Sequence, residues 1–202
     1  MKAIFKREVK SYFTGMIGWV VAAVSLFFLG LYYTNRNLLY ASSDFASVLY
    51  TMTMILLFLL PAISMRSFAE ERKNRTDQLL LTSPVSVFGI VLGKFFAMAA
   101  VFALPCLVDA VMILILRALG STASAMAASF SGLLCYFLLG CAAIALCEFL
   151  SGLTENQIIA AVAGFSALLL AYLMPSLRSL FIAGSAVALA VFTALAAAAS
   201  LA

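Results

Sequence analysis

Long apolar runs separated by short polar segments dominate the sequence. About 20 residues of α-helix cross the hydrocarbon core of a bilayer, and six runs reach roughly that length. We expect membrane-spanning helices over residues 16–34, 45–65, 85–116, 125–148, 156–174 and 180–202. The alternation typical of strands is absent, and a helix satisfies its own backbone hydrogen bonds in lipid. The pattern therefore predicts an all-α integral membrane protein with six transmembrane helices.

Residues 2–14, ahead of the first run, show a helical pattern of another kind. Apolar side chains recur at positions 5, 9, 12 and 13, whereas Lys2, Lys6 and Lys10 line another side. Such a helix lies in the membrane interface with its lysines near anionic headgroups, and a solvated N-terminal tail is the alternative. The following run is too long for a signal peptide and lacks a small-residue cleavage site, so we expect it to be retained.

Charge supports a membrane location and indicates an orientation. Charged residues make up 10% of the chain and the mean hydropathy is +1.17, whereas a soluble domain carries about 25% charged residues. If the N-terminus is cytoplasmic, nine of the twelve Lys and Arg residues fall in cytoplasmic segments, as the positive-inside rule requires. We therefore expect one domain, residues 1–202, in the cell (cytoplasmic) membrane. The sequence has no basic face with interspersed aromatic residues, so it does not predict a nucleic-acid partner.

Cysteine and histidine usage argues against a metal site. Histidine is absent, and the four cysteines lie inside apolar runs without a CxxC pair. They are interpreted as small packing residues, and no metal ligand set is predicted. No G-x-x-x-x-G-K-[ST] phosphate loop is present either, so nucleotide binding by this chain is not expected.

Eight of the twenty charged residues lie in residues 66–94, between the second and third apolar runs. We expect the chain to leave the membrane near Arg66, to form a short charged helix, and to re-enter after Ser83 as a helix cap and Pro84 at the first helical position. Ion pairs four residues apart contribute only about 0.2–0.5 kcal/mol each, which does not explain so dense a cluster. A docking surface is the hypothesis, and a solvated loop is the alternative.

Three stretches resemble one known family. FAEERKNRTDQLLLTSPVSVFGIVLGK (68–94) resembles the coupling segment of ABC-transporter permeases of the type-two exporter family, most closely its gliding-motility-type branch. FKREVKSYFTGMIGWV (5–20) resembles that branch's amphipathic elbow helix and first span, and SGLTENQIIAAVAGF (151–165) its turn between the fourth and fifth spans. Arg75 stands where the pattern has Gly, and Gln78 where it has a charged residue. The family's last segments are missing, so we expect the complete permease to be longer.

The resemblance implies a fold and a set of partners. It implies an elbow helix over residues 2–14, a cytoplasmic coupling segment over 66–84, and a dimer with a second permease copy or a paralogue. It also implies a separate ATP-binding-cassette ATPase subunit in the bacterial inner membrane, which would bind ATP and Mg, so this chain would need no cofactor and would not itself be an enzyme. The ATPase-coupling residues implied are Glu70, Glu71, Arg72, Lys73, Thr76 and Asp77.

Asp109 is a candidate for the translocation path. It follows Lys94 by 15 residues, or about 22 Å of helix. An acidic side chain at the bilayer centre costs about 2.5–3.5 kcal/mol, so such residues are by default functional. Pro105, one turn earlier, can free a backbone carbonyl. The alternative is an ion pair with Arg117 or Arg36 near the outer surface.

Residues 154–157, TENQ, predict a helix start. Thr154 can cap the fifth span while Gln157 reaches back to it, and Glu155 favours the positive end of the helix dipole. The alternative is that Glu148 or Glu155 contacts the ATPase or the elbow helix on the cytoplasmic side.

The function expected is export of an unidentified substrate, driven by ATP hydrolysis in a partner subunit. An ion-gradient-driven carrier or channel subunit is the alternative, but carriers bury several ionisable groups and show matched broken helices. An intramembrane enzyme needs paired acids, a nucleophile with its base, or metal ligands, and Asp109 is the lone acid within its run.

Overall fold

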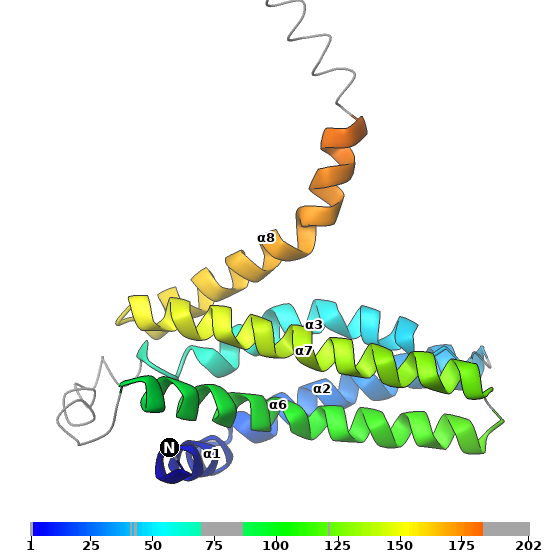
Figure 1. Ribbon diagram of the computed structural model, residues 1–202, viewed down its shortest axis with the longest axis horizontal. Helices are drawn as coiled ribbons and strands as arrows, with labels where there is room; N and C mark the ends of the chain where they lie inside the picture. The colour runs from blue at the N-terminus through cyan, green and yellow to red at the C-terminus, as the bar shows by residue number, and fades with distance from the viewer. Residues whose placement is uncertain (1, 41, 43, 70–86, 121, 184–202) are drawn as a thin grey trace, which may run out of the picture. The chain divides into compact units, whose positions relative to one another are not determined.

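The computed structural model describes residues 2–40, 42, 44–69, 87–120 and 122–183. All regular secondary structure in these residues is helical, which confirms the predicted all-α class for them. The chain divides into two compact units, Met1–Phe165 and Ser166–Ala202, and the first holds the helix bundle and the candidate sites described below. The elements are α1 (Lys2–Thr14), α2 (Ile17–Tyr33), the π-helical segment η1 (Thr34–Leu39), α3 (Ala46–Ser64), α6 (Val87–Ala118), α7 (Ala123–Leu153) and α8 (Gln157–Ala183) (Figure 1).

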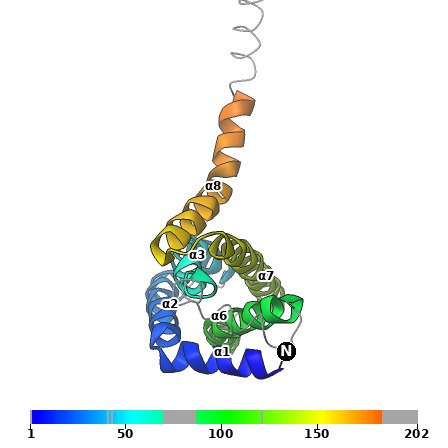
Figure 2. The same cartoon turned by 90° about the vertical axis from the view of Figure 1, so that its left-hand side faces the viewer.

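Four helices form a closed ring. α2 packs against α3, α3 against α7, α7 against α6, and α6 against α2, and the end-on view in Figure 2 shows them around a common centre. α1 lies across one end of this bundle, where it contacts α6 and α2 (Figure 2). The chain turns between α1 and α2 at Met16, whose φ of 61° is left-handed. The bundle centre is apolar, and its almost fully buried side chains include Leu29, Leu60, Ile63, Met98, Ile113 and Ile144.

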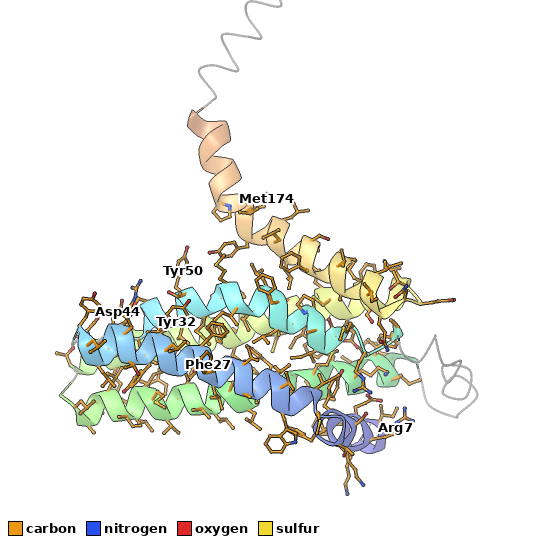
Figure 3. The ribbon with its side chains drawn as sticks, turned by 180° about the vertical axis from the view of Figure 1, so that it is seen from behind. Arg7, Phe27, Tyr32, Asp44, Tyr50 and Met174 are labelled. Carbon is orange, nitrogen blue, oxygen red and sulfur yellow. The ribbon has the colours of Figure 1, made fainter. Side chains whose placement is uncertain are left out.

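The outside of the bundle is also apolar. Phe27 on α2 and Tyr50 on α3 are 63% and 73% exposed and point away from the bundle (Figure 3). Arg7 and Asp44 lie at opposite ends of it (Figure 3). An apolar exterior between two polar ends is what a bilayer requires, since lipid tails are as apolar as a protein core.

Five helices in the described part are long and apolar enough to cross a membrane. They are Ile17–Leu39, Ala46–Ser64, Phe88–Ala118, Ser124–Leu153 and Gln157–Pro175. Most of the sixth expected span, residues 180–202, lies outside the described residues. The fifth helix does not end at residue 174 but continues through Pro175 to Ala183. An internal proline removes one helix hydrogen bond, and membrane helices tolerate this because neighbouring groups satisfy the backbone.

Local hydrogen bonds explain where the helices begin. Asp44 Oδ1 accepts from the Ala46 N–H at 3.0 Å at the start of α3, and Thr122 Oγ1 accepts from the Ala125 N–H at 3.4 Å at the start of α7. At α8 the expected capping box is wrong. Asn156 Oδ1 accepts from the Ile158 N–H at 3.0 Å, whereas Thr154 ends α7. An Asn directly before the first helical residue caps it as well as Thr does, so the start lies two residues later than expected.

Candidate functional site

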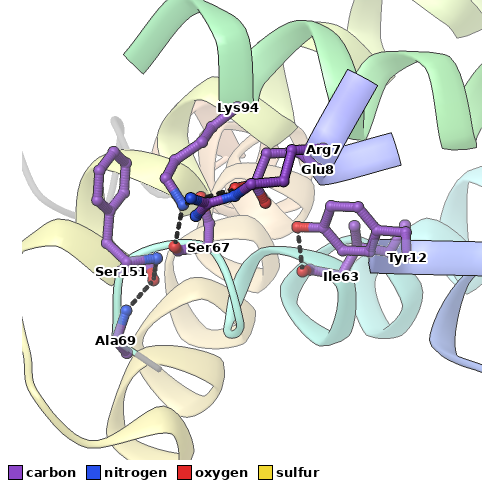
Figure 4. A network of polar contacts seen from close by, with 9 residues as sticks. Arg7, Glu8, Tyr12, Ile63, Ser67, Ala69, Lys94 and Ser151 are labelled. Carbon is purple, nitrogen blue, oxygen red and sulfur yellow. Dashed lines mark hydrogen bonds and ion pairs between the residues drawn. The ribbon is translucent and has the colours of Figure 1, made fainter. Parts of the chain in front are cut away.

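A buried polar cluster lies where α1 crosses the end of the bundle (Figure 4). Four elements contribute to it: α1, the turn that follows α3, the first part of α6 and the last part of α7. The turn, residues 65–69, is also the described beginning of segment 66–84. The cluster therefore surrounds the place where the chain leaves the bundle toward that segment.

Lys94 is the centre of this cluster. Its side chain is 1% exposed, and Nζ donates a hydrogen bond of 2.7 Å to the Ser67 carbonyl (Figure 4). Nζ also lies 3.7 Å from Glu8 Oε1 on α1 and 5.0 Å from the centre of the Phe68 ring. A buried ammonium is tolerated only when it is paired and hydrogen-bonded. Lys94 thus joins α6, α1 and the turn after α3 through one charged group.

The approach of α1 to α6 depends on a small residue. A Cβ at Gly93 would lie 3.1 Å from Ile4 Cγ2, so a larger residue there would push α1 away from α6. This close contact brings Glu8 to Lys94. Arg7 Nη2 lies 3.5 Å from the same Glu8 oxygen, which adds a second positive charge on the more exposed side.

Two further contacts hold the turn after α3. Ser151 on α7 is fully buried, and its Oγ accepts from the Phe68 and Ala69 N–H groups at 3.4 and 3.3 Å (Figure 4). The Tyr12 hydroxyl on α1 donates to the Ile63 carbonyl at 3.3 Å. The last carbonyls of a helix have no partner within the helix, and Tyr12 supplies one at the end of α3. The backbone from the end of α3 to Ala69 is thus held from α1, α6 and α7.

Glu148 lies at the edge of the cluster. It is 4% exposed, and its carboxylate is close enough to Lys94 to interact with it electrostatically. Its Oε1 is buried and has no hydrogen-bond partner in the described part of the chain. Glu155, the other acid expected at this end, is exposed in the connection between α7 and α8. The structure thus brings Glu148, but not Glu155, into a buried polar environment.

The implied ATPase-coupling residues lie outside the described residues. They are Glu70, Glu71, Arg72, Lys73, Thr76 and Asp77, and their contact with a partner stays a prediction. Among residues 66–69, Arg66 packs over Gly15, where a Cβ would lie 2.8 Å from Arg66 Nη1.

Asp109 is buried in α6, 4% exposed. It is close enough to Tyr136 on α7 and to Cys106 to interact with both electrostatically. In the described part of the chain no ion pair joins it to Arg117 or Arg36, and the Arg117 Nη1 donates to Met126 Sδ at 3.0 Å instead. The alternative interpretation, in which Asp109 forms an ion pair with Arg117 or Arg36, is therefore not supported. The role of Asp109 in a translocation path stays a prediction.

Sequence reasoning missed the partners of Lys94. The sequence did give a signal for Lys94 itself, since a lone lysine inside an apolar span is by default a functional or paired residue. Glu8 and Ser151 had no comparable signal, because one lies on an amphipathic helix rich in charge and the other resembles any small polar residue. No group of three or more His, Cys, Asp or Glu side chains suited to a metal ion occurs among the described residues.

Comparison with known proteins supplies a family. A profile of the family described as ABC-2 family transporter protein matches residues 30–200, which include α3, α6 and α7 with the cluster residues they carry. No curated protein matches the chain, and no solved structure does.

Proposed function

Since the chain belongs to the ABC-2 family of transporter proteins, we propose that it is the permease subunit of an ATP-binding-cassette exporter. It is a multi-pass membrane protein. A separate ATPase subunit docks on segment 66–84 through Glu70, Glu71, Arg72, Lys73, Thr76 and Asp77. ATP and Mg bind to that subunit, and this chain carries no cofactor.

The hydrogen bond between Lys94 Nζ and the Ser67 carbonyl carries this proposal. Ser67 is the second residue of segment 66–84, and Lys94 ties it to α6 and, through Glu8, to α1. A displacement of the segment by a docked ATPase is therefore transmitted to α6, α1 and α7 at once, since Ser151 holds the next two residues. A solvated loop with no docking role needs no buried ammonium at its first residues, because burying a charge is costly.

The finer assignments belong to the same proposal. We assign the chain to the gliding-motility-type branch, which its three resembling stretches support, and α1 to an elbow helix in the membrane interface. It works as a dimer with a second copy or a paralogue in the cytoplasmic membrane, with the N-terminus and segment 66–84 on the cytoplasmic side. Asp109, buried on α6, lines the translocation path.

Charge reversal at Glu70 and Glu71 tests the docking surface. In mild detergent, the Glu70→Lys/Glu71→Lys variant is expected to co-purify with at least about tenfold less ATP-hydrolysing activity than the wild-type chain does, since removing one partner of a charge pair at an interface costs about 2–5 kcal/mol. Arg36→Glu, an exposed charge reversal on η1, is the matched control and should retain full activity. A double variant with the same ATP-hydrolysing activity as the wild type would refute the docking site. Transport that does not depend on ATP but follows a proton or sodium gradient would favour a carrier.

Thiol labelling tests the orientation. In a background with the four native cysteines replaced by alanine, Asn74→Cys should react with a membrane-impermeant thiol reagent only after the cells are permeabilised. Arg36→Cys, expected on the other side, should react in intact cells. Labelling of Asn74→Cys in intact cells would place segment 66–84 outside, where no cytoplasmic ATPase can reach it.

A further inference from the structure

An apolar groove lies on the surface of the bundle between α6 and α7, beside the polar cluster. Its volume is about 550 Å³, within the roughly 300–1,000 Å³ of pockets that hold small ligands. Its apolar walls include Val91, Leu92 and Phe95 of α6 and Ala145, Phe149 and Leu153 of α7. Phe149 and Leu153 are 67% and 63% exposed, so the groove opens to the outside of the bundle, where lipid lies.

Glu148 is the one ionisable side chain among the described residues that line this groove. The residue is 4% exposed, and its Oε1 is buried without a hydrogen-bond partner in the described part of the chain. Lys94 is close enough to Glu148 to interact with it electrostatically, but its Nζ is bonded to the Ser67 carbonyl and paired with Glu8. A buried carboxylate oxygen in a native protein is almost always hydrogen-bonded. The wall of the groove therefore holds an acceptor that lacks a donor within the described part of the chain.

The depth of Glu148 in the membrane indicates that the donor is part of a lipid headgroup. The candidate span Ser124–Leu153 has 30 residues, or about 45 Å of helix, whereas the hydrocarbon core is about 30 Å thick. A centred helix therefore extends about 7 Å beyond the core at each end. Glu148 lies five residues before Leu153, about 7.5 Å along the axis. This places its carboxylate at the boundary between acyl chains and headgroups.

We propose that this groove binds a phospholipid whose headgroup carries a primary amine, phosphatidylethanolamine. The ammonium donates to the Glu148 carboxylate, and an acyl chain lies along the apolar walls of α6 and α7. Charge complementarity favours this lipid, since an anionic headgroup would meet a carboxylate. A choline headgroup is excluded from the hydrogen bond because its nitrogen carries no N–H. The bound lipid would rest against Phe68, which lines the same groove and stacks on Lys94.

Lipid competition measured by native mass spectrometry tests the amine preference. The purified chain is incubated with equal amounts of phosphatidylethanolamine and phosphatidylcholine that carry identical acyl chains, and the retained lipids are counted. The wild type is expected to retain about tenfold more of the ethanolamine lipid, since a charge-assisted hydrogen bond contributes about 1.5–3 kcal/mol. Glu148→Gln keeps the side-chain size but removes the charge, and it should reduce this ratio to about one. Glu155→Gln, the same change at an exposed position, should leave the ratio unchanged.

A second variant blocks the groove without touching the carboxylate. A Cβ at Gly152, which lines the groove, meets no atom within 4 Å, so Gly152→Leu can extend into the open space without disturbing the fold. It should lower the retention of both lipids. Gly30→Leu on α2, where a Cβ also meets no atom within 4 Å, is the steric control and should retain both.

Three results would overturn the proposal. They are equal retention of the two lipids by the wild type, an unchanged preference in Glu148→Gln, and a Gly152→Leu variant that changes the oligomeric state but not lipid retention. The last result would assign the groove to a second copy of the chain. None of these measurements involves an ATPase, so a negative outcome leaves the proposed function standing.

Discussion

Replacement of Lys94 by methionine is expected to lower the free energy of unfolding by about 3 kcal/mol. Methionine fills most of the volume of the lysine side chain, so the loss comes from the charge. Without the ammonium, the Ser67 carbonyl loses its buried 2.7 Å hydrogen bond, and Glu8, whose side chain is 13% exposed, loses a partner at 3.7 Å. Removing one member of a buried pair costs more than the pair itself contributes, because the remaining group is buried without compensation.

The measurement is chemical unfolding of the purified protein in detergent, with Lys10→Met as the control. Lys10 lies on α1 and is exposed, and exposed charges away from contacts contribute less than about 0.5 kcal/mol. A double variant, Lys94→Met with Glu8→Gln, should lose less stability than the two single changes added together, since both act on one interaction. If Lys94→Met unfolds at the same denaturant concentration as Lys10→Met, the cluster does not hold α1 to α6.

Gly140→Val is expected to lower the free energy of unfolding by about 3 kcal/mol. The ring of Phe102 on α6 fills the space beside Gly140 on α7, and any Cβ there would overlap the ring. Phe102 is 2% exposed, lies parallel to the Phe137 ring with centroids 5.9 Å apart, and contacts the Tyr136 ring at 5.7 Å. The ring cannot move aside without losing these contacts, so the packing of α6 on α7 must change.

Thermal unfolding compares this variant with Gly30→Val. Gly30 is also inside a membrane-spanning helix, and a Cβ there meets no atom within 4 Å, so its valine should change stability by less than about 1 kcal/mol. Replacing the Phe102 ring by a smaller side chain, in the double variant Gly140→Val/Phe102→Leu, should restore part of the lost stability, since the two positions share one space. Equal melting temperatures for Gly140→Val and Gly30→Val would contradict the close contact of α6 and α7 at this level.

The contacts of α1 could not be predicted from the sequence, although the helix itself could. Its helical pattern over residues 2–14 and the apolar runs that follow are local features. The lysine spacing predicts a face toward headgroups, but nothing in it indicates that Glu8 faces α6. The family resemblance of segment 66–84 likewise predicts a partner surface without revealing that Ser67 is bonded to Lys94. Both contacts join residues distant in the sequence, and they depend on how the helices are arranged.

The start of α8 shows the same limit at short range. TENQ offers two good capping residues, Thr154 and Asn156, and sequence preference hardly separates them. The structure uses Thr154 as the end of α7 and Asn156 as the start of α8. The choice follows from where α7 ends, which is a property of its packing and not of the four residues.

The amino-acid sequence alone determined that this chain is helical, that it belongs in a membrane, and that its charges concentrate between the second and third apolar runs. Only the tertiary structure decided which faces of the helices meet, and so that Glu8, Lys94 and Ser151 hold the turn after α3 and that Glu148 borders an open groove. The reason is that a soluble helix marks its buried face by an apolar stripe. A helix in lipid is apolar on every side, so its pattern does not distinguish the face toward protein from the face toward lipid.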